Sequence, residues 1–97
     1  MPKESCFQAD LIKELKAIFP GCIVLKNDPN YIQGFPDLLV LYNSRWAALE
    51  CKASHISAKR PNQDYYIRKL DSMSYAAFIY PENKMEIINE LQTALQS

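Results

Sequence analysis

Apolar residues recur at intervals of three or four from residue 4 to residue 19, and this spacing predicts an amphipathic helix. Pro20 and Gly21 follow directly and end it. Two more helices are predicted, one from Pro61 to about residue 72 and one from Pro81 onward, because proline suits the first position of a helix. In the last helix four apolar residues share one face: Ile87, Ile88, Leu91 and Leu95.

Four short apolar runs predict strands at residues 22–25, 37–42, 45–52 and 75–80. The first run is apolar throughout, which is typical of a buried strand. Polar residues predict loops at 27–30 and 53–60, and Asn43-Ser44 predicts a tight turn. The predicted order is therefore α-β-β-β-α-β-α, an α/β domain with helices flanking a mixed sheet.

The length and composition are those of one globular domain spanning residues 1–97. Hydrophobic residues make up 48% of the 97 residues and charged residues 23%. No apolar run approaches the roughly 20 residues of a membrane span, and residues 1–10 lack the pattern of a secretory signal. The three cysteines, at positions 6, 22 and 51, form no CxxC pair, which disfavours a disulfide framework or a zinc site. We therefore expect a cytoplasmic protein with no membrane partner.

The net charge is zero, but the basic residues are unevenly distributed. Between Cys51 and Leu70 a single acid, Asp64, accompanies five basic residues: Lys52, Lys59, Arg60, Arg68 and Lys69. Such a segment can bind the phosphates of DNA even when the whole chain is neutral, although a solvated face has the same composition. Tyr65 and Tyr66 lie within it, and a tyrosine there can pack on a sugar or base. Core packing is expected for at least one of the two.

Charged residues at the ends of two apolar strands carry the strongest chemical signal. If Asn43-Ser44 is a two-residue hairpin turn, Asp37 lies directly opposite Glu50, with their Cβ atoms about 4.5–5.5 Å apart. Two carboxylates this close repel each other, and a divalent cation such as Mg²⁺ or Mn²⁺ would relieve the conflict. Lys52 is two residues beyond Glu50 and points to the same face, whereas Cys51 points to the opposite face, into the core. Two acids and a lysine suit phosphodiester hydrolysis; a salt-bridge cluster at a sheet edge is the alternative.

The pattern Pro36-Asp37, a gap, then Glu50-Cys51-Lys52 resembles the signature of the PD-(D/E)XK nuclease superfamily. The fuller arrangement resembles the virus-type replication-repair nuclease (VRR-NUC) domain, in its stand-alone phage and bacterial form. The features that match are Glu4 with Gln8, the strand 34–39, the Glu50–Lys52 triplet and Pro61-Asn62-Gln63. The resemblance covers nearly the whole chain and implies a restriction-endonuclease-like core.

The resemblance also implies roles for individual residues. Asp37, Glu50 and the backbone carbonyl of Cys51 would hold Mg²⁺, with Mn²⁺ as a substitute, and Lys52 would be the catalytic lysine. Gln63 would contact the active site or the scissile phosphate, and Glu4 would approach the metal through water, with Glu14 as its competitor. Cysteine at position 51, where the family usually has a small aliphatic residue, is a mild departure. The DNA-binding residues would be Lys59, Arg60, Arg68, Lys69 and Tyr65.

The predicted activity is that of a Mg²⁺-dependent endodeoxyribonuclease selective for branched DNA, similar to a Holliday-junction resolvase, with no nucleotide cofactor. Symmetric cutting of a junction needs two active sites, so a homodimer is expected, with Trp46, Phe35 and the tyrosines near Tyr65 available for an interface. The alternatives are nicking or flap cleavage in phage replication or DNA repair, a toxin or restriction component, and a non-catalytic DNA-binding module. His55, in a loop, is expected at the surface.

Overall fold

The computed structural model describes residues 3–96 and has seven elements in the predicted order. The helices are α1 (Glu4–Ile18), α2 (Pro61–Met73) and α3 (Lys84–Gln96). The strands are β1 (Ile23–Lys26), β2 (Leu38–Tyr42), β3 (Arg45–Cys51) and β4 (Tyr75–Ile79). The α/β class and the α-β-β-β-α-β-α order are thereby confirmed.

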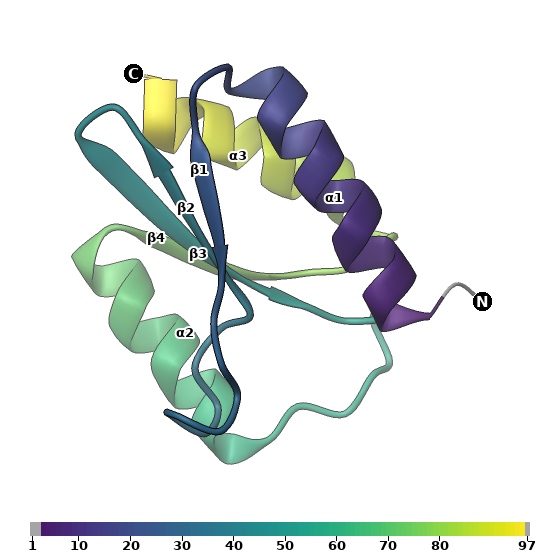
Figure 1. Ribbon diagram of the computed structural model, residues 1–97. Coiled ribbons are helices and arrows are strands. Elements are labelled where there is room, and N and C mark those ends of the chain that lie inside the picture. The colour runs from purple at the N-terminus through teal and green to yellow at the C-terminus, as the bar shows by residue number, and fades with distance from the viewer. Residues whose placement is uncertain (1–2, 97) are drawn as a thin grey trace.

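The four strands form one mixed sheet in the order β1-β2-β3-β4. β1, β2 and β3 are joined by antiparallel pairings, whereas β4 runs parallel to β3 after the α2 crossover. Helices α1 and α3 lie on one face of the sheet and α2 on the other (Figure 1). The fold is therefore a three-layer sandwich.

Each face of the sheet has its own apolar cluster, because alternate residues of a strand point to opposite faces. The larger cluster lies beneath α1 and α3 and contains Leu11, Leu15, Val40 and Leu91, all at most 1% exposed. The smaller cluster lies beneath α2 and centres on Ala48, Leu70 and Ala76. An ion pair between Lys84 and Glu14 (2.9 Å) joins the start of α3 to α1.

Strand β1 differs from the sequence prediction. Its apolar run predicted a buried strand, but Ile23 is 56% exposed and Leu25 44% exposed. β1 is an edge strand, and α2 crosses only β3 and β4, so no helix covers these two side chains. Only Val24, which points toward α1, packs against the larger cluster. An apolar run of four residues does not distinguish an edge strand from a central one.

The last helix begins at Lys84 rather than at Pro81. Residues 81–83 form a turn, which the Asn83 side chain stabilises through two hydrogen bonds to the preceding residues. Its Oδ1 accepts from the Tyr80 N–H (2.9 Å), and its Nδ2 donates to the Phe78 carbonyl (3.0 Å). The four apolar residues predicted to share a face of this helix are all buried.

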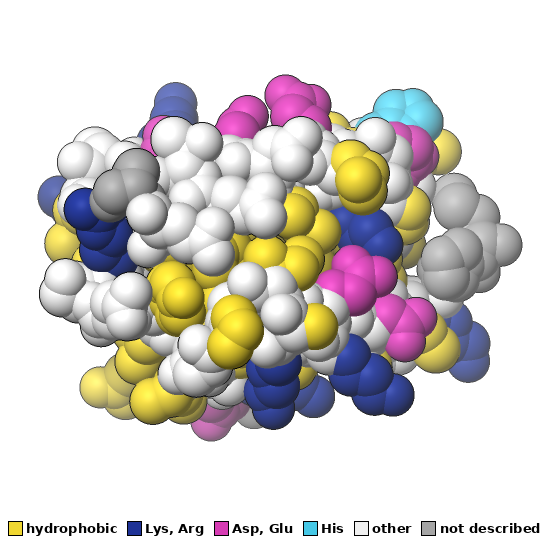
Figure 2. Space-filling view, turned by 90° about the horizontal axis from the view of Figure 1, so that it is seen from above, with side chains coloured by type: hydrophobic (Ala, Val, Ile, Leu, Met, Phe, Trp, Pro, Cys, Tyr) yellow, Lys and Arg dark blue, Asp and Glu magenta, His cyan; other side chains and the backbone are white. Residues whose placement is uncertain are grey.

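The surface seen in Figure 2 has apolar side chains in its middle and charged side chains of both signs around its edges. Within residues 3–96, no helix has the length and apolar character needed to cross a membrane.

Candidate active site

The β2–β3 hairpin sets the position of the two strand-end acids. Tyr42 pairs with Arg45 and Leu38 with Leu49, which confirms the two-residue turn at Asn43-Ser44. Asn43 has a φ of 55°, in the left-handed region that asparagine tolerates better than most residues. One step beyond Leu38 and Leu49, this register places Asp37 opposite Glu50, as predicted.

Hydrogen bonds between the two strand ends fix both carboxylates. The Asp37 N–H donates to Glu50 Oε1 (3.1 Å), and the Cys51 N–H donates to Asp37 Oδ2 (3.0 Å). Glu50 is only 4% exposed, whereas Asp37 is partly exposed. A backbone N–H just before β2 thus orients Glu50, and one at the end of β3 orients Asp37. The position of the acid pair therefore follows from the pairing of the two strands.

Gln63, on the first turn of α2, connects Lys52 to Glu50. Its Oε1 accepts from Lys52 Nζ (2.8 Å) and from the Arg60 N–H (3.1 Å), and its Nε2 donates to Glu50 Oε2 (3.0 Å). Lys52 Nζ also donates to the Ala58 carbonyl (3.0 Å) and lies 3.9 Å from Glu50 Oε2. The structure therefore brings Asp37, Glu50, Lys52 and Gln63 together in one cluster.

The electrostatics of the cluster are dominated by an excess of buried negative charge. Burial, together with the charge of Asp37, raises the pKa of Glu50 from 4.5 to about 7, against the opposing effect of Lys52. Burial likewise raises the pKa of Asp37, although the hydrogen bond from Cys51 opposes the shift. A single ammonium does not neutralise the site, which favours an additional cation.

The structure distinguishes between the two acids of α1 that compete for a place near the site. The pKa of Glu4 is raised by burial and by the charge of Asp37, with Lys52 opposing, so Glu4 is electrostatically coupled to the cluster. Glu14 instead pairs with Lys84, the first residue of α3. Glu4 is thus the α1 acid at the edge of the site.

Asp37 and Glu50 face a pocket of about 260 Å³, here called the acidic pocket. Its other lining residues come from the β1–β2 loop and from the start of α2: Pro29, Asn30, Gln33, Gly34, Phe35, Arg60 and Gln63. Gly34 has a φ of +85°, and a Cβ there would lie 2.4 Å from the Asn62 Cβ. Only glycine allows the loop to close this tightly on α2.

The donor set fits a hard divalent cation. Asp37 Oδ1 makes no hydrogen bond to residues 3–96, and the carboxylate oxygens of Glu50 keep lone pairs beyond those that accept hydrogen bonds. Over that same span no group of three or more histidine, cysteine or acidic side chains is arranged to hold a metal ion. The Cys51 side chain is fully buried in the larger cluster, and burial raises the pKa of its thiol. Its carbonyl as a ligand stays a prediction.

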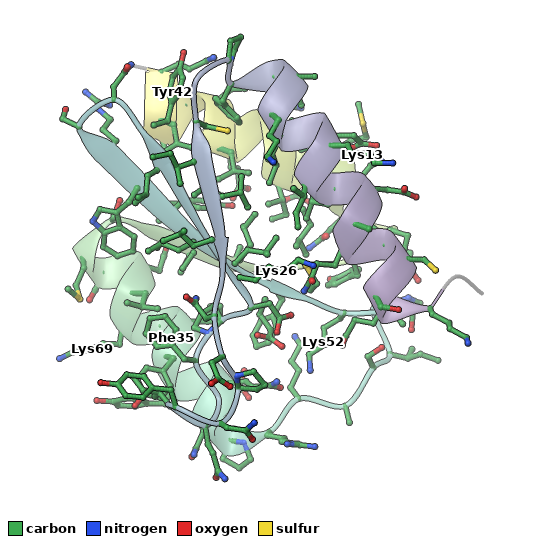
Figure 3. All side chains as sticks on the ribbon, viewed as in Figure 1. Lys13, Lys26, Phe35, Tyr42, Lys52 and Lys69 are labelled. Carbon is green, nitrogen blue, oxygen red and sulfur yellow. The ribbon has the colours of Figure 1, made fainter. Side chains whose placement is uncertain are left out.

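The five predicted DNA-binding residues are all exposed: Lys59, Arg60, Tyr65, Arg68 and Lys69. Arg60 lines the acidic pocket, whereas Lys59 Nζ lies 4.4 Å from the centroid of the Phe78 ring, over β4. Figure 3 shows Lys69 pointing away from the body of the protein, on the other side of the ribbon from Lys52. Tyr66 packs against the smaller cluster, so one tyrosine of the pair is a packing residue, as expected.

Other sequence expectations also have clear outcomes. His55 lies at the surface as predicted, and its Nδ1 lies 2.5 Å from Glu82 Oε2. Cys6 is exposed and Cys22 is partly buried, so Cys51 alone is fully buried among the three. Two parts of the site were not predicted from the sequence: Asn62, against which Gly34 packs, and the Ala58 carbonyl, which accepts from Lys52. Gly34 next to Phe35-Pro36 was the one available signal that the loop closes on a neighbour.

Comparison with known proteins gave no match to any family model, curated protein or solved structure.

Proposed function

We propose that this protein is a Mg²⁺- or Mn²⁺-dependent endodeoxyribonuclease that hydrolyses phosphodiester bonds in branched DNA. The observation that carries the proposal is the hydrogen-bonded pair of opposed acids, Asp37 and Glu50, linked through Gln63 to a buried lysine. A non-catalytic binding module gains nothing from two like charges held side by side, one of them buried, since their repulsion and desolvation reduce stability.

In this proposal Asp37 and Glu50 hold the cation, with Glu4 at its outer side. A bound Mg²⁺ or Mn²⁺ supplies Lewis-acid activation of the phosphate and of the attacking water. Lys52 offsets the negative charge that develops on the phosphate during hydrolysis. Gln63 and the Ala58 carbonyl each accept a hydrogen bond from its ammonium, and together they orient it without neutralising its charge.

We further propose that the active form is a homodimer, which gives one active site to each of two strands. The support is the face of β1 and β2 that α2 leaves uncovered. The end of this face toward the β2–β3 turn holds a groove lined in part by Leu41, Trp46 and Met73, with the exposed Ile23 on the strand beside it. Burying such a face against a second copy removes apolar surface from water.

The proposal is tested by incubating the purified protein with linear, nicked, flapped and four-way DNA in Mg²⁺, in Mn²⁺ and in chelator. We expect cleavage with either metal, none in chelator, and a preference for the four-way DNA. Cleavage that persists in chelator would contradict the mechanism. A preference for nicked or flapped DNA over the four-way substrate would instead support the alternative of nicking or flap cleavage.

A further inference from the structure

A second pocket, here called the loop pocket, opens beside the acidic pocket. Its volume is about 450 Å³, and its lining residues are Asn27, Asp28, Tyr31, Ile32, Phe35 and Leu39. Phe35 also lines the acidic pocket, so the β1–β2 loop forms a wall of both. A volume in the range of about 300–1,000 Å³ is typical of sites for small organic groups, so a planar heterocycle fits.

One aromatic residue of the loop pocket, Tyr31, is more exposed than packing requires, and a row of further rings begins at Phe35. Tyr31 is 84% exposed, although it is among the largest side chains of the loop. Phe35 meets Tyr66 at a centroid distance of 5.4 Å, and Tyr66 meets Tyr65 at 5.1 Å. Figure 3 shows Phe35 beside α2, at the start of this row. An exposed ring such as that of Tyr31, next to the proposed nuclease site, is suited to stacking on a base.

Asp28 distinguishes a base from a phosphate. Its Oδ1 accepts from the Asn30 N–H (2.8 Å), while its Oδ2 makes no hydrogen bond to residues 3–96. A carboxylate repels phosphate but accepts hydrogen bonds from the exocyclic amino groups of adenine, cytosine and guanine. Unpaired thymine has no exocyclic amine and offers only its N3–H, whereas an amine offers two N–H bonds, so the pocket favours bases that carry an amine.

The backbone holds the loop pocket in a fixed position relative to Asp37. The Asn27 N–H donates to the Asp37 carbonyl (2.8 Å), and Asn27 Nδ2 donates to the Pro36 carbonyl (2.7 Å). The Phe35 N–H closes a turn onto the Ile32 carbonyl (3.3 Å). A group bound in this pocket therefore lies at a set position beside the acid pair.

We propose that the loop pocket binds one unpaired nucleobase with an exocyclic amine, next to the phosphodiester at Asp37 and Glu50. This inference rests on the proposed nuclease function. It gives the protein a means to recognise branch points and unpaired ends, where bases are already unstacked and their extraction costs less than from a paired duplex. Tyr31 stacks on the base, and Asp28 accepts from its amine.

The test measures DNA affinity by fluorescence anisotropy in chelator, so that cleavage plays no part. The probes are a duplex with one extrahelical adenine, the same duplex with an extrahelical thymine, and the fully paired duplex. We expect wild type to bind the adenine probe about ten-fold more tightly than the paired duplex, in the range of one base stacked on an aromatic ring. Tyr31→Ala should remove this preference, and Tyr31→Phe should restore it. Asp28→Asn keeps an oxygen that accepts from the Asn30 N–H but lacks the second carboxylate oxygen. It should therefore reduce the difference in affinity between the adenine and thymine probes.

The matched control is Met85→Ala on α3, where the side chain is 71% exposed and remote from both pockets; it should bind as wild type does. Equal affinity of wild type for the three probes overturns the inference, and so does a Tyr31→Ala variant that keeps the preference. The nuclease proposal is judged separately by metal-dependent cleavage with wild type. If wild type prefers the adenine probe but does not cleave DNA, the nuclease proposal is rejected and the base pocket is retained. If it cleaves DNA but binds the three probes equally, the base pocket is rejected and the nuclease proposal is retained.

Discussion

Lys52 and Glu50 do not form a direct hydrogen bond: Lys52 Nζ lies 3.9 Å from Glu50 Oε2, and Gln63 bridges the two. The Gln63 amide donates to Glu50 and accepts from Lys52, so each of these two side chains has a hydrogen-bond partner in Gln63. This arrangement ties the first turn of α2 to the end of β3. Much of the chemistry proposed for the site therefore depends on the amide of Gln63.

Replacing Gln63 tests whether its hydrogen bonds to Lys52 and Glu50, rather than its side-chain volume, are needed for cleavage. Gln63→Leu retains much of the side-chain volume but removes the side-chain hydrogen bonds to Glu50, Lys52 and Arg60. We expect cleavage to fall by about 10–100-fold, the range found for outer residues that orient metal ligands. Cleavage rates measured over a Mg²⁺ titration check this, and Gln92→Leu on α3, an exposed glutamine, is the control. Unchanged cleavage by Gln63→Leu would mean that the amide only caps α2.

The two acids should be indispensable for cleavage but not for folding. Asp37→Asn and Glu50→Gln keep the shape of each side chain and remove one negative charge, so cation binding is lost while repulsion of DNA is reduced. We expect no detectable cleavage and equal or tighter DNA binding. Glu14→Gln, which changes an acid paired with Lys84, should cleave as wild type does. Substantial cleavage by either site variant would rule out the proposed mechanism.

Lys52 has a larger structural role than its position at a strand end predicted. A charged residue at a strand end ordinarily adds little to the packing of the core, yet Lys52 is 7% exposed and donates to both Gln63 and Ala58. Lys52→Ala removes two hydrogen bonds from a charged donor, so we expect a loss of about 1–3 kcal/mol in the free energy of unfolding, along with most activity. Urea unfolding of Lys52→Ala beside Lys13→Ala, an exposed lysine of α1, measures the difference.

The shifted pKa of Glu50 gives the metal-free protein a characteristic pH dependence. Its folded pKa of about 7 exceeds the unfolded value of 4.5, so the folded state retains a proton that the unfolded state has lost. Stability is therefore greatest below pH 4.5 for this group and falls as the pH rises to 7, by on the order of 2–3 kcal/mol. The raised pKa values of Asp37 and Glu4 act in the same direction.

Denaturant unfolding in chelator from pH 4.5 to 8 tests this dependence. Glu50→Gln, which cannot ionise, should lose most of the slope and be more stable than wild type at pH 8. A wild-type stability that rises with pH across this window would show that the acid pair is not destabilised by burial.

The sequence predicted the hairpin and its acid pair because both depend on local rules. A two-residue turn fixes the register, and the register places Asp37 opposite Glu50 without knowledge of the rest of the fold. Position along the chain also placed Gln63 on the first turn of α2. The exposure of Ile23 and the burial of Lys52 were not predictable in this way, because each depends on where α2 crosses the sheet.

Charge reversal should show that Arg60 contributes more to DNA binding than its neighbour Lys59. Arg60 lines the acidic pocket, whereas Lys59 contacts Phe78 over β4. We expect Arg60→Glu to weaken binding to all DNA forms and to reduce the salt dependence of binding by about one phosphate contact. Lys59→Glu should have a smaller effect. Affinities measured over a range of salt concentrations distinguish the two, and an unchanged affinity of Arg60→Glu at low salt would place the DNA elsewhere.

The uncovered face of β1 and β2 should determine the oligomeric state. Ile23 is 56% exposed and lies across from Leu41, which lines the same groove as Trp46 and Met73. If a second copy covers this face, Ile23→Asp places a charge in an apolar interface, and the dimer should dissociate without loss of the fold. Sedimentation equilibrium at micromolar concentration measures the change.

Met85→Asp, at a 71% exposed position on α3, is the control and should sediment as wild type does. Because Ile23 points away from the larger cluster, circular dichroism should show the same helical content for both variants. The two-site model for junction cleavage also predicts that the Ile23→Asp monomer nicks four-way DNA on one strand but does not resolve it. A wild-type protein that sediments as a strict monomer, and shows no preference for the junction, would leave single-strand nicking or flap cleavage as the activity of this domain.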